Sequence, residues 1–151
     1  MSQSLANVLI HLVYSTKHRK PFLRDPNTRE ELNKYLTSCY KSLESPVIIV
    51  NGTEDHIHSL FSLSRNYAIK TIVQKLKVDS SKWIKARDRS FRDFAWQRGY
   101  GAFSVSESNK EAVRRYIMNQ EHHHKRMTYQ VAFRKICAQH GVALDERYAW
   151  D

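Results

Sequence analysis

Two histidines separated by one residue, His56 and His58, lie in the apolar segment EDHIHSLFSL at positions 54–63. A segment of this composition predicts a strand, and side chains at i and i+2 of a strand project from the same face, roughly 7 Å apart along the backbone. Two imidazoles placed in this way can converge on one divalent metal ion, with the neighbouring Asp55 or Glu54 orienting a ring. The alternative is two half-exposed strand residues without a ligand, because the motif alone is weak.

A tyrosine and a glutamine four residues apart, Tyr116 and Gln120, form a second pair that can carry chemistry. On a helix this spacing puts both side chains on one face. A phenol with its usual pKa of about 10 is a poor nucleophile at neutral pH, but a nearby cation stabilises the phenolate and polarises a phosphodiester. Without the histidines, the simpler interpretation is a core aromatic and a solvated amide.

Three consecutive histidines, His122, His123 and His124, follow this pair. Consecutive helical residues diverge by about 100°, so the three cannot chelate one ion together. We therefore expect a solvated, weakly basic patch. His123 lies seven residues after Tyr116, on a similar helix face, and is the one expected to approach the site or a phosphate.

The formal net charge of the chain is +10, and its excess of basic residues is local. Residues 65–98 hold ten bases against three acids. Such a surface attracts polyanions, of which nucleic acid is the commonest, although charge runs are also found on solvated helix faces. The expected phosphate or base contacts are Lys70, Lys75, Lys77, Lys82, Lys85, Arg87, Arg92, Trp96 and Arg98.

The elements that must position these residues follow from hydrophobic periodicity and turn residues. Asn51-Gly52 predicts the turn of a hairpin, and Ser108-x-x-Glu111 has the spacing of a helix capping box. The predicted strands are 8–14, 47–50, 55–63 and 100–106, and the predicted helices are 27–43, 66–86, one from 108 that includes 120, and 129–140.

This order predicts an α+β fold of the ferredoxin-like, split βαβ type. Its four-stranded antiparallel sheet has helices packed on one face, and C-terminal helices carry the tyrosine. The length fits a single domain, residues 1–151. Cys39 and Cys137 are far apart in the sequence and suggest neither a zinc ribbon nor a disulfide framework. The first residues lack the features of a signal peptide and no segment is long and apolar enough to cross a membrane, so we expect a cytoplasmic protein.

The ordered set of motifs resembles a known family. His56-Ile57-His58, the segment VRRYIMNQEHHHK with Tyr116 and Gln120, and the opening HLVYSTKHRKPFL are similar to the small single-tyrosine HUH transposases of bacterial and archaeal insertion sequences. The REP-associated tyrosine transposases are near relatives of these enzymes. The resemblance extends over essentially the whole chain, to the final ERYAWD.

The resemblance implies a specific activity. His56, His58 and Gln120 would bind Mg²⁺ or Mn²⁺, and Tyr116 would attack a phosphodiester of single-stranded DNA. The products would be a 5′-phosphotyrosyl enzyme and a free 3′-hydroxyl, which can reverse the attack and rejoin strands. Family members act as homodimers that recognise DNA hairpins at the ends of the element, and the tyrosine helix of one subunit can complete the other subunit's site.

Two other functions remain open beside the active transposase. One is a non-enzymatic hairpin-binding protein derived from the same fold, which would be expected to have lost a ligand or the nucleophile. The other is a domesticated relative that acts on repeated palindromic elements of its host genome. Relaxases and replication initiators share the histidine motif, but they are usually longer and order their motifs differently.

Overall fold

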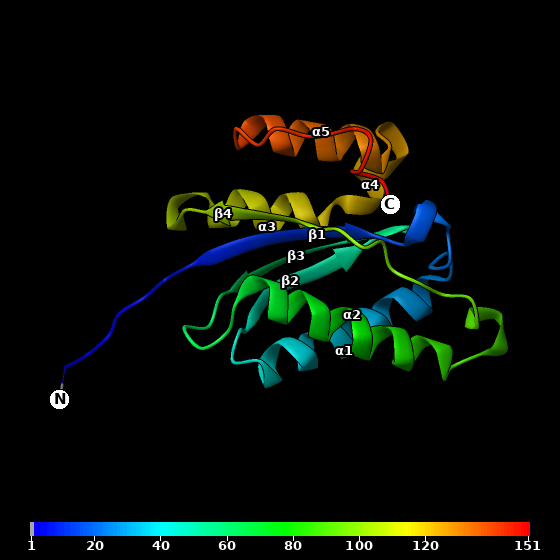
Figure 1. Cartoon of the computed structure of the whole chain (residues 1–151), viewed down its shortest axis with the longest axis horizontal. Coiled ribbons are helices and arrows are strands. Elements are labelled where there is room, and N and C mark those ends of the chain that lie inside the picture. Colours follow the sequence, from blue (N-terminus) through cyan, green and yellow to red (C-terminus); the bar gives the residue numbers. More distant parts are fainter. Residues whose placement is uncertain (1) are drawn as a thin grey trace.

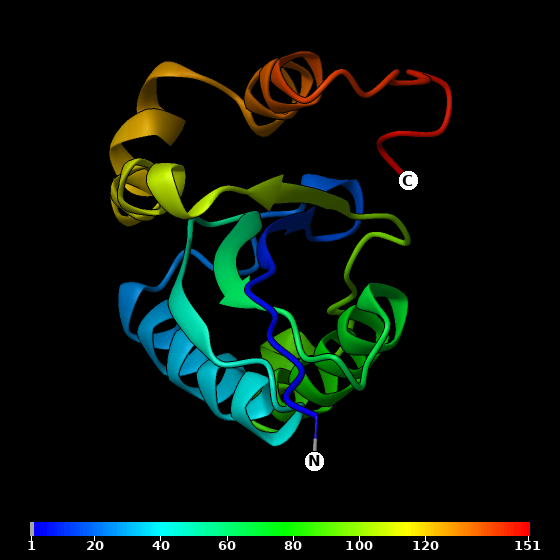
Figure 2. The same cartoon turned by 90° about the vertical axis from the view of Figure 1, so that its left-hand side faces the viewer.

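The computed structural model describes residues 2–151 and has an antiparallel four-stranded sheet at its centre. The strand order is β2-β3-β1-β4, so the strand that carries the histidine pair, β3, lies inside the sheet. Helices α1 and α2 cover one face, and α3, α4 and α5 lie over the other (Figure 1). Figure 2 shows the sheet from the side, between these two helical layers. The predicted α+β ferredoxin-like plan with C-terminal helices carrying the tyrosine is confirmed.

Most predicted boundaries agree with the structure to within a few residues. Three short 3₁₀ helices lie in the connections, at Lys17–Arg19, Arg89–Phe91 and Glu107–Asn109. The strands are β1 Leu9–Ser15, β2 Val47–Gly52, β3 His56–Ser62 and β4 Gly101–Val105, and the helices are α1 Pro26–Ser42, α2 Ile69–Lys85, α3 Lys110–Met118, α4 Gln120–Arg126 and α5 Tyr129–Gln139.

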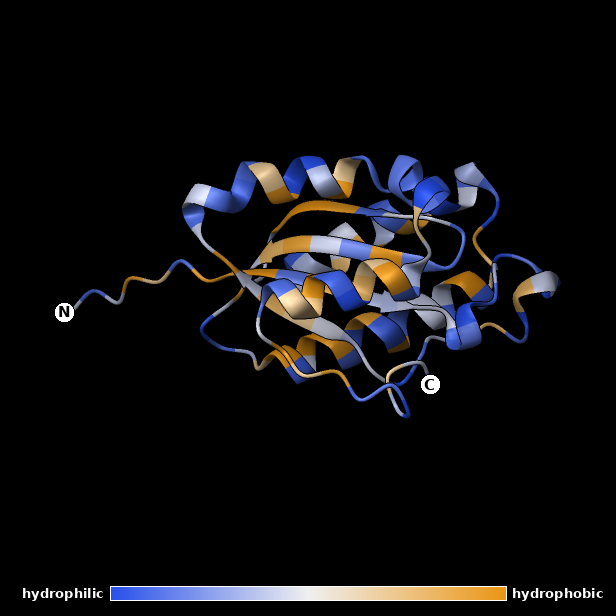
Figure 3. Ribbon diagram, turned by 90° about the horizontal axis from the view of Figure 1, so that it is seen from above, coloured by the Kyte–Doolittle hydropathy of each residue, from blue (hydrophilic) through white to orange (hydrophobic). Residues whose placement is uncertain are grey.

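The two faces of the sheet have different chemistry because alternate residues of each strand point to opposite sides. Toward α1 and α2, β1 and β3 contribute apolar residues to the larger core, including Leu12 and Phe61. Toward α3–α5 they present Leu9 and Leu60 at one end and His58 and His56 at the other. Hydrophobic and hydrophilic residues alternate along the covering helices (Figure 3), as amphipathic packing requires. The polar half of this second face is where the site forms.

The hairpin between β2 and β3 differs from its prediction. Asn51 and Gly52 belong to β2, where they pair with His58 and Ile57, and residues 53–55 form the connection. Asn51 is retained in the strand because its side-chain amide donates to the carbonyls of Ile117 and Met118 at 3.0 and 3.1 Å. The residue predicted to make the turn therefore ties β2 to the end of α3.

The prediction of one long helix from Ser108 through Gln120 is also wrong. The expected capping box does not form: Ser108 lies in a 3₁₀ turn, and Glu111 pairs with Arg114 and Arg115 instead. The helix then ends at Met118, and Asn119, with φ −97° and ψ 22°, separates it from α4. Tyr116 and Gln120 consequently lie on two helices that meet at Asn119.

Among the described residues 2–151, no helix combines the length and the apolarity that crossing a membrane requires.

Candidate metal and nucleophile site

His56 begins β3 and is almost completely buried, with 2% of its surface exposed. Its Nδ1 lies 2.6 Å from Oδ1 of Asp55 and 2.9 Å from the Thr53 hydroxyl, which itself donates to the same carboxylate oxygen at 3.2 Å. A carboxylate only accepts hydrogen bonds, so Nδ1 of His56 carries the proton and Nε2 has a free lone pair. The predicted supporting role of Asp55 thus has a geometric basis, since Asp55 fixes the tautomer and orientation of a ring that faces inward.

His58 is buried beside His56, and the two ring centroids are 5.2 Å apart. Its Nδ1 lies 2.8 Å from Nε2 of His11, a buried residue on the neighbouring strand β1. Its Nε2 is buried without a hydrogen-bond partner among residues 2–151. Burial, together with the charges of His11 and then His56, holds the pKa of His58 well below its usual value of 6.5. His58 is therefore a neutral imidazole whose second nitrogen is unused.

Gln120 is the first residue of α4 and its side chain is buried. Its Nε2 donates to the backbone carbonyl of Tyr116 at 3.2 Å, which turns Oε1 toward Nε2 of His56, 3.4 Å away. Both of these facing atoms are acceptors when His56 is protonated on Nδ1, so a hydrogen bond does not explain their approach. The break at Asn119 is what allows Gln120 to reach under the end of α3.

Tyr116 covers the same pocket from α3. Its ring lies edge-on to those of His58 and His11, with centroids at 5.8 and 6.2 Å, and is stacked on His123 at 4.7 Å. It lines a cavity of about 550 Å³ between the sheet and the C-terminal helices. Burial raises the pKa of the phenol above 10, and the nearby Gln120 amide opposes this only in part. The phenol is therefore protonated at neutral pH in the absence of a cation.

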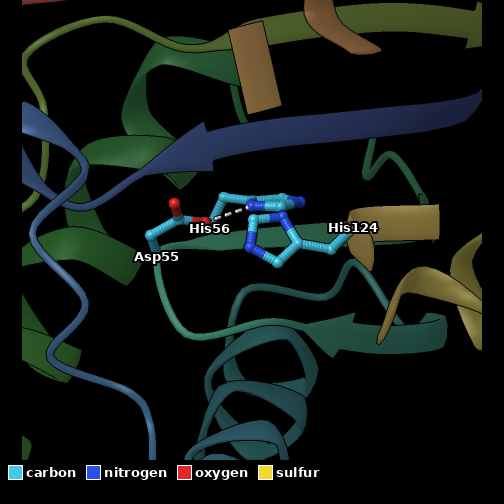
Figure 4. A group of neighbouring side chains, drawn as sticks. All are labelled: Asp55, His56 and His124. Carbon is cyan, nitrogen blue, oxygen red and sulfur yellow. Dashed lines mark hydrogen bonds and ion pairs between the residues drawn. The ribbon is translucent and has the colours of Figure 1, made fainter. Parts of the chain in front are cut away.

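The three consecutive histidines separate as their helical spacing predicts. His122 is exposed, whereas His123 stacks on Tyr116, as expected for the histidine seven residues later. His124 departs from the predicted solvated patch, because it packs against His56 with the ring centroids 5.4 Å apart. Asp55, His56 and His124 each offer a metal-ligating atom within 4.8 Å of the others (Figure 4).

His11 and His124 also belong to this group, although neither was predicted to lie at the site. His11 contacts His58 through the antiparallel pairing of β1 with β3, in which Val13 lies opposite His58. No local pattern contains that register. For His124 a signal existed: it follows Gln120 by four residues and so shares its helix face.

The donor set fits a divalent cation. Nε2 of His56 and Oε1 of Gln120 face each other as acceptors, and Nε2 of His58 is a buried polar atom without a partner. Buried acceptors that face one another are unfavourable unless a positive charge lies among them. Neutral imidazoles and an amide oxygen are suitable ligands for such an ion.

Most of the predicted DNA contacts lie on the opposite face of the sheet. The residues on α2 are separated by the sheet from the pocket under α3 (Figure 1). Lys77 is largely buried and donates to the carbonyls of Gln97 and Gly99 at 2.9 and 2.8 Å. Trp96 is in the core, where its indole N–H donates to Ser80 at 2.9 Å. Neither Lys77 nor Trp96 is available to DNA in this structure, because their polar groups already have partners inside the protein.

The other predicted contacts are exposed: Lys70, Lys75, Lys82, Lys85, Arg87, Arg92 and Arg98. Two of them have acidic neighbours, since Arg87 pairs with Glu31 and Arg92 lies 3.8 Å from Asp93.

The sequence of this chain matches the model of a known protein family. A family model described as "Transposase IS200 like" matches residues 4–120, which include β1–β4, both histidines of β3, Tyr116 and Gln120. The chain belongs to the IS200-like transposase family. The resemblance drawn from its motifs is thereby confirmed.

Solved structures share the fold of this transposase chain. A protein from Deinococcus radiodurans R1, described as a candidate transposase, is 21% identical with a TM-score of 0.61, over 80% of this chain and 98% of that one. A REP-associated tyrosine transposase bound to a REP hairpin is 11% identical with a TM-score of 0.53, over 78% of this chain and 68% of that one. No protein of curated function matches the transposase sequence significantly.

Proposed function

We propose that the protein is a metal-dependent transposase that cleaves and rejoins single-stranded DNA at insertion-sequence ends through a 5′-phosphotyrosine intermediate. The observation that carries the proposal is the approach of Oε1 of Gln120 to Nε2 of His56, beneath the tyrosine that is the proposed nucleophile. A cation held by His56, His58 and Gln120, Mg²⁺ or Mn²⁺, would supply Lewis-acid polarisation of the scissile phosphate.

In the proposed reaction, the Tyr116 hydroxyl loses its proton to solvent and its oxygen attacks phosphorus. The bond from phosphorus to the 3′-oxygen breaks, the leaving 3′-oxygen takes up a proton, and a 5′-phosphotyrosyl bond forms. Asp55 holds the proton of His56 on Nδ1 and leaves Nε2 unprotonated, and His11 would do the same for His58 when Nδ1 of His58 donates to it. Because the new ester retains the bond energy, attack by a 3′-hydroxyl reverses the step and rejoins DNA.

One chain contains every residue of this proposed site. Tyr116 lies over His58 of its own chain, and Gln120 reaches the same pocket two residues beyond the end of α3. In the proposed reaction the tyrosine therefore acts on the histidines of its own chain; the alternative is a homodimer in which the tyrosine helix of one subunit completes the site of the other.

The decisive experiment uses hairpin-bearing single-stranded DNA with a label 3′ to the cleavage point, incubated with Mg²⁺ or Mn²⁺. Wild type should give a labelled protein adduct on a denaturing gel, and Tyr116→Phe should give none. Tyr148→Phe, which changes an exposed tyrosine of the tail, is the matched control and should retain the adduct. An adduct in Tyr116→Phe would assign the nucleophile elsewhere. Hairpin binding by wild type without an adduct or cleavage would favour the non-enzymatic or domesticated binding protein.

The exposed lysines of α2 support a proposed role in holding the hairpin. Neutralising phosphates releases counterions, so DNA affinity should fall steeply as salt increases. Combined Lys70→Gln, Lys75→Gln and Lys82→Gln substitutions should weaken binding and flatten the salt dependence. Lys34→Gln is a suitable control, because this exposed lysine of α1 already lies 3.6 Å from Glu30. Equal salt slopes for the two proteins would remove α2 from the DNA-binding surface.

A further inference from the structure

His56 also belongs to a second group of potential metal ligands, together with Asp55 and His124. A carboxylate oxygen of Asp55 and one nitrogen each of His56 and His124 lie within 4.8 Å of one another. In Figure 4 the His124 ring reaches over His56 while Asp55 points at the His56 ring from the other side. His56 is the only residue that this group has in common with the proposed ligands of the catalytic cation.

His124 has an unused nitrogen in this position. Its Nδ1 is buried and has no hydrogen-bond partner among residues 2–151. Its Nε2 lies 3.7 Å from a carboxylate oxygen of Glu54. A carboxylate beside one imidazole nitrogen favours the proton on that nitrogen and leaves the other as a lone pair, which is the usual arrangement of a histidine that binds metal.

The donor types fit zinc. Two imidazoles and one carboxylate leave a fourth position for water in a tetrahedral Zn²⁺ site, with ligand distances of about 2.0–2.2 Å. Ligand atoms of such a site are separated by about 3.3 Å. The Asp55 oxygen and Nδ1 of His56, now 2.6 Å apart, would therefore separate slightly, and the His124 nitrogen, which lies within 4.8 Å of the others, would move up to about 1.5 Å closer. His124 has 23% of its side chain exposed and lies on a helix of two turns, which gives it room to move. The Asp55 side chain, 14% exposed, brings the negative charge that offsets the ion.

We infer that Asp55, His56 and His124 form a Zn²⁺ site whose occupation inhibits the transposase. The inference rests on the proposed function, because inhibition follows from the need of both ligand sets for His56. Zinc bound at the His56 nitrogen beside Asp55 takes the place of the proton on Nδ1, and the neutral ring then carries its proton on Nε2, the atom that faces Gln120. His56 then has no lone pair left for the catalytic cation. The DNA-cleaving and zinc-bound states are then mutually exclusive.

The direct test measures Zn²⁺ affinity without DNA, by competition with a chromophoric chelator. Replacing one of three protein ligands should weaken binding at least as much as losing an outer hydrogen-bond partner, which costs about 10–100-fold. We therefore expect His124→Ala to lower Zn²⁺ affinity tenfold or more. Gln120→Ala should leave the zinc affinity within about twofold of wild type. His122→Ala is the matched control, since it removes an exposed histidine from the same helix.

Equal zinc affinity of wild type and His124→Ala would overturn the site, as would a loss caused by Gln120→Ala but not by His124→Ala. A second variant, His124→Gln, tests whether a loss of zinc affinity comes from unfolding of the helix. The far-ultraviolet circular dichroism spectra of His124→Ala and His124→Gln should match that of wild type. With Co²⁺ as the probe, wild type should give the visible absorption of a four-coordinate ion, and His124→Gln should reduce it. A spectrum unchanged by the substitution would also count against the site.

Inhibition of the transposase by zinc is tested by a separate measurement. The ratio of adduct formation in Mn²⁺ with and without added Zn²⁺ should be low for wild type and His122→Ala, and near one for His124→Ala at the same zinc concentration. A wild type that forms no adduct in Mn²⁺ alone would contradict the proposed function, while the affinity measurements would still decide the zinc site. Equal ratios for wild type and His124→Ala would show that zinc does not inhibit through His124.

Discussion

Oε1 of Gln120 lies 3.4 Å from Nε2 of His56, and the hydrogen bonds on the far sides of both groups make each of these atoms an acceptor. Two acceptors that face each other in a buried position repel unless a cation or a proton lies between them. The contact joins the start of β3 to the start of α4 across 64 residues of sequence. It is therefore a tertiary relationship that a bound cation would explain.

Substitution of Gln120 tests this relationship. Gln120→Ala removes one of three proposed ligands, so the affinity for Mn²⁺ should fall by about tenfold or more. Electron paramagnetic resonance of the free ion measures this affinity. Gln74→Ala, at an exposed position of α2, should bind Mn²⁺ as wild type does. Unaltered Mn²⁺ affinity in Gln120→Ala would mean that the amide oxygen is not a ligand.

His11 should matter to metal binding although it is not a proposed ligand. His11→Ala leaves Nδ1 of His58 without its 2.8 Å partner, so the His58 ring loses its fixed orientation. Losing such an outer partner costs about 10–100-fold in metal affinity, which isothermal titration with Mn²⁺ measures. His122→Ala should bind normally. If His11→Ala also binds Mn²⁺ normally, packing alone orients His58.

The buried histidines should make the metal-free protein sensitive to acid. Burial, and then the charge of His140, lowers the pKa of His11 from 6.5 to about 4. Between these pH values the unfolded chain binds a proton that the folded chain does not, so stability is fully present above pH 6.5 and falls toward pH 4. The shift corresponds to about 3 kcal/mol, and the lowered pKa of His58 acts in the same direction.

Urea unfolding in the presence of a chelator measures this pH dependence. His11→Gln removes the His11 contribution and should flatten the fall in unfolding free energy between pH 6.5 and 4, whereas His122→Gln should not. Identical slopes in wild type and His11→Gln would show that His11 becomes protonated without cost in the folded state.

Asn51 should control the position of the nucleophile from a distance. Its amide caps the carbonyls of Ile117 and Met118, where α3 ends just after Tyr116. Asn51→Ala leaves these carbonyls without that donor, which should lower the free energy of unfolding by about 1–2 kcal/mol and slow adduct formation. Asn33→Ala on α1 is the comparison. Stability loss without slower adduct formation would mean that Asn51 contributes only to folding.

The location of Tyr116 over its own His58 predicts that one chain suffices for cleavage. A mixture of Tyr116→Phe with His58→Ala, each lacking a different half of the site, should form no adduct. Recovery of roughly a quarter or more of wild-type adduct would show that the tyrosine acts on a partner's histidines. The control is a mixture of wild type with His58→Ala, in which the wild-type share of activity should persist.

Local patterns were sufficient to predict the sheet and the paired histidines. The composition of residues 54–63 predicts the strand β3, and the period-two geometry of a strand puts His56 and His58 on one face without reference to any other element. The register of β1 against β3, which brings His11 to His58, depends on pairing across 47 residues and leaves no local trace. The helix break at Asn119 was missed for a similar reason. No glycine or proline marks it, and the Asn51 amide that satisfies the broken end comes from a distant strand.

Side-chain charge was a poorer guide than periodicity. Lys77 was predicted to contact phosphate because it lies among other bases, yet its amino group is saturated by backbone carbonyls. Trp96 was predicted to stack on bases, but it packs against Tyr14 and Phe94 in the core. Composition describes which groups a segment has, whereas only the packed structure decides which of them face solvent.

The segment that follows residue 120 lies outside the region matched by the family model, and yet it covers His56. His124 of α4 and Tyr129 of α5 both pack on the His56 imidazole, with ring centroids 5.4 and 5.0 Å away. The strands that hold the histidine pair and the helices that enclose it are thus separable along the chain. An exchange of the segment from Glu121 to Gln139 with that of a relative would alter the surroundings of His56 without changing β3 or Gln120. Selection acting on that segment can therefore change the packing around His56 while leaving the strand that carries it unchanged.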